Sequence, residues 1–408
     1  VEASVGCDGA PHLDLRQSRF LPVGSAGERA ATWQIPVCAR YGTKGGSREG
    51  CTLLAAQTGS LVLEGNECPG WVLPNADGAG YYRWSLPAAD LARLRAAGWQ
   101  DLRPRERLSV ADSLTAAFAA ATLPAAAVFA TLEPLALDGS RAVAVAPMAL
   151  LGFARDYLAA DGLRTQVESF GRGLYEPVHR RLGWEPRPEE DGETKILRAK
   201  VIEFLARVAL DPAVRRDAAA RGRRLVGDGG LRLETVSPEL VDVVLPVAVQ
   251  EGDAAFFDAL VDRLHASRDD LTRSRILGAV GATHDPVLAE RARALSLDPR
   301  IHLNETTRTL TGQMRERETR DATWEWIKAH FDGLTARLSQ RGVGSTPLLA
   351  SSFCDPERAA DVEAFFAPRI GSLAGGPRNL AAALEAIRLC AARVEAQRAS
   401  AREFFGSQ

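Results

Sequence analysis

The histidines of this chain have the wrong spacing for a catalytic metal site. The chain contains six of them, His12, His179, His265, His284, His302 and His330. A helix that binds catalytic zinc presents two imidazoles one turn apart in a His-Glu-x-x-His pattern, with the glutamate as the base. No two histidines here have three residues between them. We therefore expect no catalytic residue, no metal ligand and no cofactor on this chain.

Three arginines form the densest basic group with aromatic neighbours. They are Arg315, Arg317 and Arg320, and Trp324 and Trp326 follow them closely. Guanidinium groups bind carboxylates through paired hydrogen bonds, so these residues are candidates for contact with the carboxylate of a peptide substrate. The alternative is a solvated turn whose charge is neutralised by acidic residues beside it. The sequence leaves both interpretations open.

The spacing of the cysteines argues against a zinc-finger or a redox motif. The six cysteines are Cys7, Cys38, Cys51, Cys68, Cys354 and Cys390, and no Cys-x-x-Cys pair occurs among them. If Lys44 and Gly45 form a hairpin turn, Cys38 lies opposite Cys51, and we predict a disulfide between them. That bridge would favour the bacterial periplasm or the extracellular space over the cytoplasm. For Cys354 and Cys390 we expect buried free thiols.

Length and charge exclude several classes of protein. A chain of 408 residues exceeds one ordinary core, so we expect at least two domains. Fifty basic and 52 acidic residues give a formal charge of −2, which argues against nucleic acid as a partner. No apolar run approaches the roughly 20 residues that span a bilayer. The first residues carry neither Met nor a signal-peptide pattern, and we expect a fragment of a longer chain.

Residues 1–86 show the pattern of short strands. The alternating set is Trp33, Ile35, Val37, Ala39 and Tyr41, with polar or small residues between them, as in a half-buried strand. Further short runs at 61–63, 71–73 and 81–84 are separated by turn residues, which predicts a small antiparallel β-sandwich. Adjacent tyrosines on such a strand point to opposite faces, so we expect one of Tyr81 and Tyr82 to face inward.

Residues 87–408 show helical periodicity. The clearest apolar stripe consists of Leu197, Val201, Phe204, Leu205 and Val208. Asp253, Asp269 and Asp285 recur every sixteen residues as helix starts, which fits a helix of about twelve residues and a short turn. We predict one α-α superhelix of HEAT- or ARM-like repeats over 87–408, which makes the chain an α+β multidomain protein. A final long helix is expected from Asn379, as its N-cap, to Phe405.

Several motifs follow one another along nearly the whole chain: Trp33–Val37, Asn75–Trp84, Arg105–Leu108 with Asp112, Arg320–Ile327 with Phe331, Phe353–Asp355, and Phe365 with Phe366. In this order they resemble the motifs of the M1 aminopeptidase family, particularly those of the endoplasmic-reticulum aminopeptidases. The resemblance covers only the last two domains of that family, the small β-sandwich and the helical C-terminal domain. The zinc ligands and the general base belong to a catalytic domain that this sequence lacks.

The resemblance implies a role for the chain in a larger enzyme. Zinc is expected in the missing catalytic domain, and the partners are expected to be the N-terminal and catalytic domains of the same enzyme together with peptide substrates. The parent enzyme would remove N-terminal amino acids from peptides. The helical part would enclose the active-site chamber and gate access to it, and Arg320 is the arginine that matches a family landmark.

Two other functions remain open on the sequence alone. The first is a stand-alone helical-repeat module that binds another protein on its concave face. The second is an inactive subunit that assembles with a separately encoded catalytic chain. A His-Glu-x-x-His sequence encoded upstream of residue 1 would favour the aminopeptidase interpretation over both.

Overall fold

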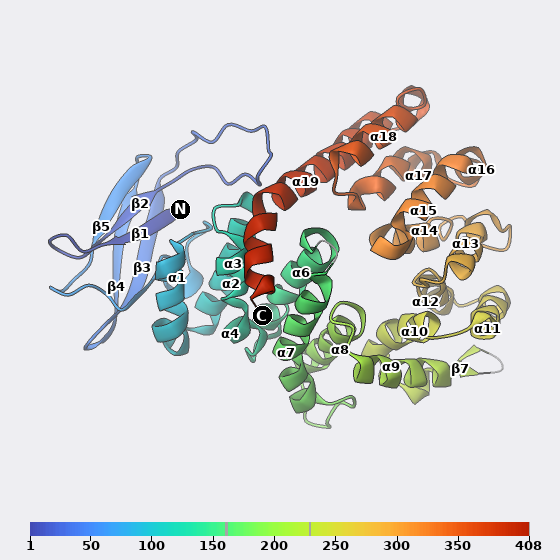
Figure 1. Cartoon of the computed structure of the whole chain (residues 1–408), viewed down its shortest axis with the longest axis horizontal. Coiled ribbons are helices and arrows are strands. Elements are labelled where there is room, and N and C mark those ends of the chain that lie inside the picture. Colours follow the sequence, from blue (N-terminus) through green and yellow to red (C-terminus); the bar gives the residue numbers. More distant parts are fainter. Residues whose placement is uncertain (160–161, 228–229, 408) are drawn as a thin grey trace. The chain divides into compact units, whose positions relative to one another are not determined.

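A computed structural model describes residues 1–159, 162–227 and 230–407. Strands occupy the first part of the chain and helices follow from Ala88 onward, as the sequence predicts (Figure 1). The chain thus has the predicted α+β composition, with small antiparallel sheets before a long helical region. A two-residue strand pair, β7 (Val226–Gly227) and β8 (Gly230–Leu231), interrupts the helical region and is not predicted by the sequence.

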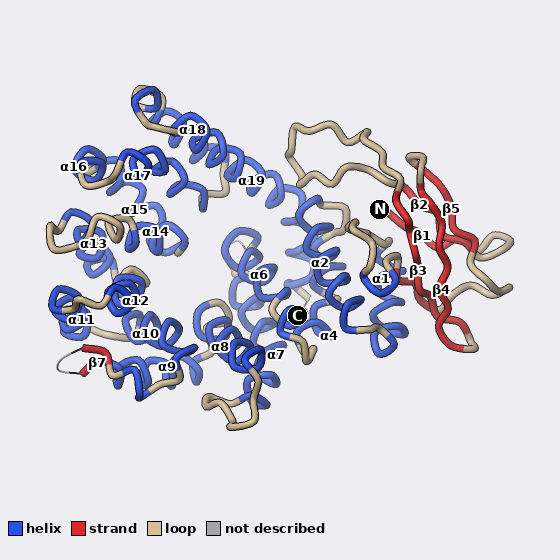
Figure 2. The backbone as a smooth tube through the Cα atoms, turned by 180° about the vertical axis from the view of Figure 1, so that it is seen from behind, coloured by secondary structure: helices blue, strands red, loops and turns tan. Residues whose placement is uncertain are grey.

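The first strands form two three-stranded antiparallel sheets (Figure 2). One sheet has the order β1-β2-β5 and comprises β1 (Glu2–Gly6), β2 (His12–Arg16) and β5 (Thr58–Val62). The other has the order β4-β3-β6 and comprises β3 (Ile35–Thr43), β4 (Gly46–Leu54) and β6 (Trp71–Leu73). The two sheets touch where β4 lies against β5.

The β3–β4 hairpin has the predicted turn and nearly the predicted inner face. Its strands end at Thr43 and resume at Gly46, so Lys44 and Gly45 form the turn. Val37, Ala39 and Tyr41 are buried, as the alternation predicts. The expectation for Trp33 is wrong, because β3 begins only at Ile35 and the Trp33 side chain is 49% exposed. The run at 81–84 also differs from the prediction, since it forms bends rather than a strand.

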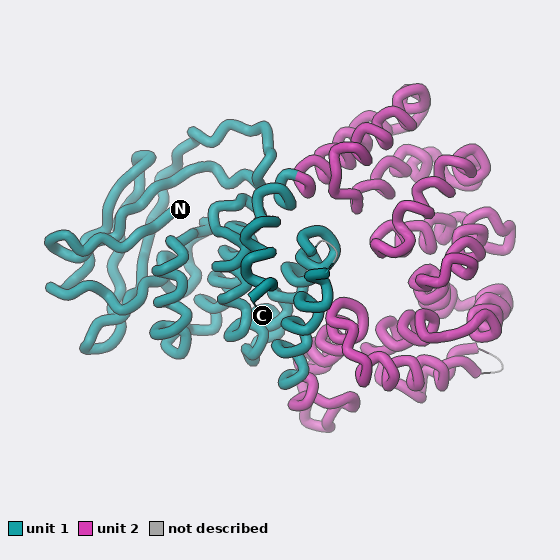
Figure 3. The backbone as a smooth tube through the Cα atoms, viewed as in Figure 1, with its two compact units in different colours: residues 1–178, 392–408 teal, residues 179–391 magenta. Residues whose placement is uncertain are grey.

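The chain forms two compact units, and the domain boundary between residues 86 and 87 stays a prediction. Unit 1 comprises Val1–Val178 and Ala392–Gln408, and unit 2 comprises His179–Ala391 (Figure 3). The first helices belong with the strands because they pack onto them. Buried Arg40 of β3, for example, pairs with buried Glu106 of α2 (Pro104–Ala120).

Unit 1 therefore contains a helical layer of its own. Phe118 of α2 and Phe129 of α3 lie 5.8 Å apart between ring centroids in its core. Besides α2, its elements are α1 (Ala88–Arg93), a π-helical turn (Leu94–Gly98), α3 (Ala125–Phe129), α4 (Leu132–Ala136), α5 (Arg141–Ala144), α6 (Ala146–Phe153), a second π-helical turn (Ala154–Leu158) and parts of α7 (Arg164–Leu182) and α19 (Gly376–Gly406).

In unit 2, helices that are two apart along the chain contact each other. Helix α10 contacts α8 and α12, and α12 contacts α14, so these helices form one continuous row. Such next-neighbour contacts are typical of a helical solenoid. The helices of the unit are α8 (Gly192–Arg207), α9 (Pro212–Leu225), α10 (Val241–Gln250), α11 (Ala254–Ala266), α12 (Asp270–Val280), α13 (Pro286–Ala294), α14 (Arg308–Arg315), α15 (Arg317–Ala329), α16 (Phe331–Ala336), α17 (Gln340–Ser345) and α18 (Pro356–Phe366).

Aspartate N-caps set the repeat of this row. The carboxylates of Asp253, Asp269 and Asp285 each accept a hydrogen bond from a backbone N–H in the first turn of α11, α12 and α13. These side chains satisfy donors that the helix itself leaves unpaired, which confirms the predicted helix starts. The predicted N-cap at Asn379 is wrong, because α19 already begins at Gly376 and the Asn379 amide donates to the carbonyl oxygen of Gly344 (2.8 Å).

All six cysteines are paired. Cys38 lies opposite Cys51 in the β3–β4 register and is bonded to it. Cys7 is bonded to Cys68, a pair that the sequence does not predict. The expectation of free thiols at Cys354 and Cys390 is wrong, because these two residues form a disulfide that joins the segment before α18 to α19.

Candidate functional site

The three candidate arginines lie at the junction of α14 and α15. Arg315 is the last residue of α14 and is exposed, and Arg317 opens α15 and is half-buried. Arg320 is buried. Its Nε donates to the carbonyl oxygen of Met314 (2.9 Å) and its Nη2 to that of Arg315 (3.0 Å). These carbonyls belong to the last turn of α14, which has no helical donors for them, so Arg320 caps the preceding helix.

Glu316, between the two helices, is the centre of a charged network within unit 2. Its carboxylate accepts a hydrogen bond from Arg207 of α8 and lies 3.4 Å from Nε2 of His284. Burial raises the pKa of this carboxyl, but the hydrogen bond with His284 and the charge of Arg207 outweigh it and lower the pKa to about 2. The network thus ties the N-terminus of α15 to an earlier helix of the row.

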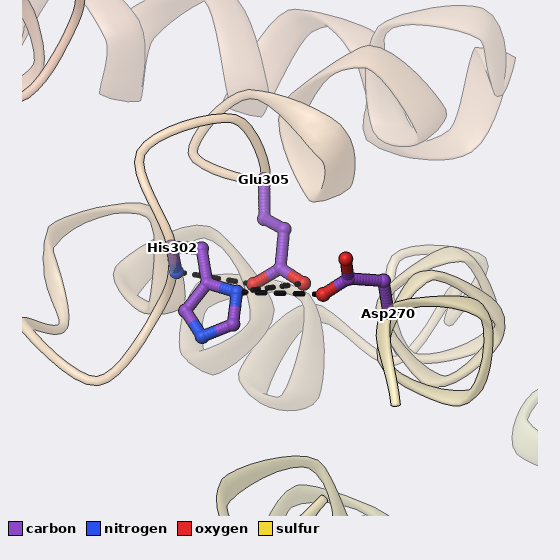
Figure 4. Close-up of side chains that lie close together, drawn as sticks. All are labelled: Asp270, His302 and Glu305. Atoms are coloured by element: carbon purple, nitrogen blue, oxygen red, sulfur yellow. Dashed lines mark hydrogen bonds and ion pairs between the residues drawn. The ribbon is translucent and has the colours of Figure 1, made fainter. Parts of the chain in front are cut away.

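Two groups of His, Asp and Glu side chains in the described chain come close enough to suggest a cation site. In the first, Nδ1 of His302 lies 3.8 Å from Oδ1 of Asp270 and 3.8 Å from Oε1 of Glu305 (Figure 4). However, Arg273 already donates to both oxygens of Glu305, with Nε–Oε1 and Nη2–Oε2 distances of 2.9 and 2.7 Å. The guanidinium supplies the positive charge that a metal ion would bring, so this group fits an ion pair better than a zinc site.

The second group has the same character. His284 lies near Glu316 and Glu318, at 3.4 and 3.9 Å, but Glu316 is engaged by Arg207. Neither group has the His-Glu-x-x-His arrangement on one helix that catalytic zinc requires. The residues that the structure describes therefore do not fit the catalytic zinc of a peptidase.

A second candidate surface is an open, mainly apolar cavity of about 730 Å³ in unit 1. Its walls are the loop between β2 and β3, the segment 75–85 after β6, and the end of α2. Of the described residues, the aromatic side chains that are markedly exposed all line this cavity: Phe20 (39%), Trp33 (49%) and Tyr81, which is fully exposed.

Polar contacts fix the segment that carries Tyr81. The amide of Asn75 donates to the carbonyl oxygen of Gly80 (3.0 Å) and accepts from its N–H (2.9 Å). The hydroxyl of Tyr82 donates to the carbonyl oxygen of Pro74 (2.7 Å), and burial raises the pKa of Tyr82. A side chain at position 80 would collide with the Tyr82 ring, 2.1 Å from the Cβ position. Tyr82 thus faces inward and Tyr81 outward, although the segment is not the strand on which the sequence prediction rests.

The loop that carries Phe20 and Trp33 is also anchored. Gln17 is buried, and its amide donates to the carbonyl oxygens of Trp33 (2.8 Å), Leu54 (3.1 Å) and Ala56 (2.9 Å). Its oxygen accepts from the N–H of Trp33 (2.8 Å). The Arg83 guanidinium stacks over the Phe20 ring at 4.6 Å. The exposed aromatics are therefore held outward by a defined framework.

Sequence reasoning did not identify this cavity. The sequence signal for it is a group of aromatic residues on loops that contain Gly and Pro, because functional residues often lie on loops. Strand periodicity instead assigned Trp33 and Tyr81 to packed strands.

No helix in the described part of the chain has both the length and the apolar character needed to cross a bilayer.

Comparison with known proteins links these features to one family. Residues 71–389 match the family model described as ERAP1-like C-terminal domain. Aminopeptidase M1 of Arabidopsis thaliana is 24% identical over 407 aligned residues, covering 94% of this chain and 45% of the relative. Aminopeptidase M1-C of Oryza sativa subsp. japonica is 21% identical, covering 96% of this chain and 45% of the relative. The chain thus spans about half the length of these curated relatives.

Proposed function

The chain belongs to the ERAP1-like C-terminal domain family and corresponds to the non-catalytic C-terminal part of an M1 aminopeptidase; on this premise we propose that it encloses the peptide chamber of a zinc aminopeptidase. The match over residues 71–389 carries this proposal. Its partners would be the N-terminal and catalytic domains of the same enzyme, and its substrates would be peptides. The helical row of unit 2 would limit which peptides enter, because a closed chamber restricts access and excludes water.

The zinc of the proposed enzyme would be held by the preceding half. Zinc supplies Lewis-acid activation of water and of the scissile carbonyl when it is bound. This chain offers no suitable ligand set in its described residues, since one glutamate of each His-containing cluster, Glu305 or Glu316, is already engaged by Arg273 or Arg207. This chain would contribute the walls of the chamber and contacts with the peptide.

The arginine group is proposed as one of those contacts. Arg315 is exposed at the end of α14, and Arg317 begins the next helix. Arg320 holds the consecutive carbonyl oxygens of Met314 and Arg315 in the last turn of α14, so it would position Arg315 rather than reach a peptide itself. A guanidinium at this place suits the carboxylate of a peptide longer than one residue.

The proposal is tested by comparing the 408-residue chain with the full-length gene product. We expect the full-length protein to bind zinc and to release amino acids from peptides and aminoacyl chromogenic substrates. The 408-residue chain should do neither. Stoichiometric zinc and amino-acid release by the 408-residue chain would refute the proposal, and so would an inactive full-length protein that lacks zinc. A gene product that starts close to residue 1 would favour the stand-alone interaction module instead.

We also propose that the protein works in an oxidising compartment, the bacterial periplasm or the extracellular space. Three pairs, including Cys7–Cys68 and Cys354–Cys390, support this location, because disulfides are rare in the cytosol. Protein isolated from its native source under denaturing conditions and alkylated before reduction should carry no label. Labelling of all six cysteines would contradict the proposal.

A further inference from the structure

The aromatic cavity of unit 1 has the character of a protein interface. Trp33 and Tyr81 are the large, rigid side chains that dominate binding energy at interfaces. Both are presented to solvent by a backbone that Gln17 and Asn75 anchor through several hydrogen bonds. An anchored aromatic surface loses little conformational freedom on binding, so it is prepared for a partner rather than for solvent.

The first residue of the chain lies on the wall of this cavity. The nitrogen of Val1 donates to the carbonyl oxygen of Arg83 (2.7 Å), and the carbonyl oxygen of Val1 accepts from the N–H of Ser85 (3.0 Å). Val1 and Glu2 both line the cavity beside Tyr81. A polypeptide joined to Val1 would therefore start from the cavity itself.

The relatives indicate what such a polypeptide contains. They are more than twice as long as the part matched here, and the matching family model describes a C-terminal domain. Most of their remaining residues therefore precede the matched region. Three arginines, Arg19, Arg29 and Arg83, line the cavity against a single acidic residue, Glu2, so a complementary surface would combine apolar and acidic side chains.

We propose that this cavity is the docking site for the catalytic half of the enzyme, which would insert an apolar surface flanked by carboxylates between Trp33 and Tyr81. This inference rests on the proposed function and specifies its domain interface. It explains why a well-anchored framework exposes aromatic rings in the 408-residue chain. It assigns the strand part of unit 1 the role of attaching the helical row to the catalytic domain.

The experiment compares side-chain accessibility in the full-length gene product and in the 408-residue chain. Hydroxyl-radical footprinting should oxidise Trp33 and Tyr81 severalfold more slowly in the full-length protein. Leu53, exposed on β4 outside the cavity, is the control and should react equally in both. Equal reactivity of Trp33 and Tyr81 in the two proteins would overturn the proposal. Concentration-dependent protection in the 408-residue chain would also overturn it, since that result indicates a second copy as occupant.

A variant series separates docking from folding. Trp33→Ser combined with Tyr81→Ser should lower the thermal midpoint of the full-length protein by several degrees and change that of the 408-residue chain much less. Leu53→Ser should change neither appreciably. Equal shifts in both proteins would mean that the residues serve unit 1 alone and would refute docking. An active full-length protein with unprotected aromatics refutes only the docking site, whereas an inactive one with protected aromatics refutes only the aminopeptidase function.

Discussion

Arg40 and Glu106 form the ion pair that attaches the strands of unit 1 to its first long helix. Nε of Arg40 donates to Oε1 of Glu106 (2.8 Å), and both side chains are buried. Glu106 also accepts from the backbone N–H of Asp77 (3.0 Å) and Arg103 (2.8 Å), so it caps its own helix. Burial raises the pKa of Glu106, but the Arg40 hydrogen bond and the two backbone donors outweigh it and lower the pKa.

Glu106→Gln should therefore destabilise unit 1 and change its pH dependence. Removing one charge leaves Arg40 buried without compensation, at a cost of about 3–5 kcal/mol. Because the folded-state pKa is lowered, the stability that Glu106 contributes is present above its unfolded pKa of about 4.5 and is lost as pH falls below that value through the lowered folded-state pKa. Denaturant unfolding across this range measures it. Glu133→Gln, at an exposed site in α4, should leave both the stability and its dependence on pH unchanged.

At the α14–α15 junction, Arg315 and Arg320 should give different phenotypes. In the full-length enzyme, Arg315→Ala should raise KM for peptides and leave KM for single-residue chromogenic substrates unchanged. The reason is that only a peptide carries a carboxylate at a distance from its N-terminal residue. Arg320→Ala should in addition lower the stability of unit 2, since it uncaps α14. Arg308→Ala, at an exposed position near the start of α14, is the control for kinetics. Equal KM changes for both substrate types would exclude a peptide contact.

At the scale of elements, the aspartate caps give unit 2 its regular helix starts. Asp285→Ala removes the acceptor for the N–H groups of Val287 and Leu288 (both 2.9 Å) and should cost about 1 kcal/mol. Asp253→Ala should act similarly on α11. Asp262→Ala, within α11 and exposed, should have a much smaller effect. Chemical denaturation of the four proteins measures the differences, and equal losses in all variants would disprove a capping role.

The Cys354–Cys390 disulfide holds the end of the helical row on α19. Replacing both residues by serine removes a cross-link between residues 36 apart and should lower the unfolding free energy of unit 2 by about 2–4 kcal/mol. Reduction of the wild-type protein breaks all three disulfides, so its loss should be at least as large as that of the double variant. If the oxidised and reduced wild-type proteins unfold at the same denaturant concentration, the bridge adds no stability.

The sequence predicts those elements whose determinants are local. The helix starts at Asp253 and Asp285 are recognisable because a cap and the N–H groups it binds lie within a few residues. The sequence does not predict elements that depend on distant contacts. Trp33 leaves the strand because Gln17, sixteen residues earlier, binds its backbone on both sides. Asn379 lies inside a helix because its amide reaches Gly344.

The candidate sites follow the same rule. The pairing partner of Cys38 can be predicted from one hairpin register, whereas Cys354 and Cys390 meet only once α18 and α19 are packed. Likewise, the spacing of the arginines cannot show that Arg320 turns back onto carbonyl groups of the preceding helix. The aromatic cavity unites three separate stretches of chain, so local patterns do not identify it.

At the scale of the whole molecule, unit 1 is discontinuous in sequence. Phe405 of α19 lies 4.9 Å from Phe129 between ring centroids, and Phe404 lies 5.3 Å from Phe170. Buried Gln397 donates to the carbonyl oxygens of Phe118 (3.1 Å) and Leu123 (2.9 Å). Residues 392–408 thus complete a core whose other members lie before residue 179.

Phe405→Ala should consequently destabilise a region far away in sequence. Loss of this buried ring should cost about 3–5 kcal/mol and accelerate hydrogen exchange in α2 and α3, with little change in α10 and α12. Phe366→Ala, at a buried site in unit 2, is the matched control and should accelerate exchange within unit 2 instead. Faster exchange near residue 366 in Phe405→Ala, with α2 and α3 unaffected, would contradict this division.

The interrupted order of unit 1 also affects how the protein is made. Residues 1–178 leave the ribosome before residues 179–391, and the phenylalanine pair that fills the core of unit 1 is synthesised only after both segments. Until then the nascent chain exposes an apolar gap around Phe129, which makes it a target for chaperones and proteases. A premature stop codon after residue 391 should therefore yield a product in which unit 1, rather than unit 2, is degraded.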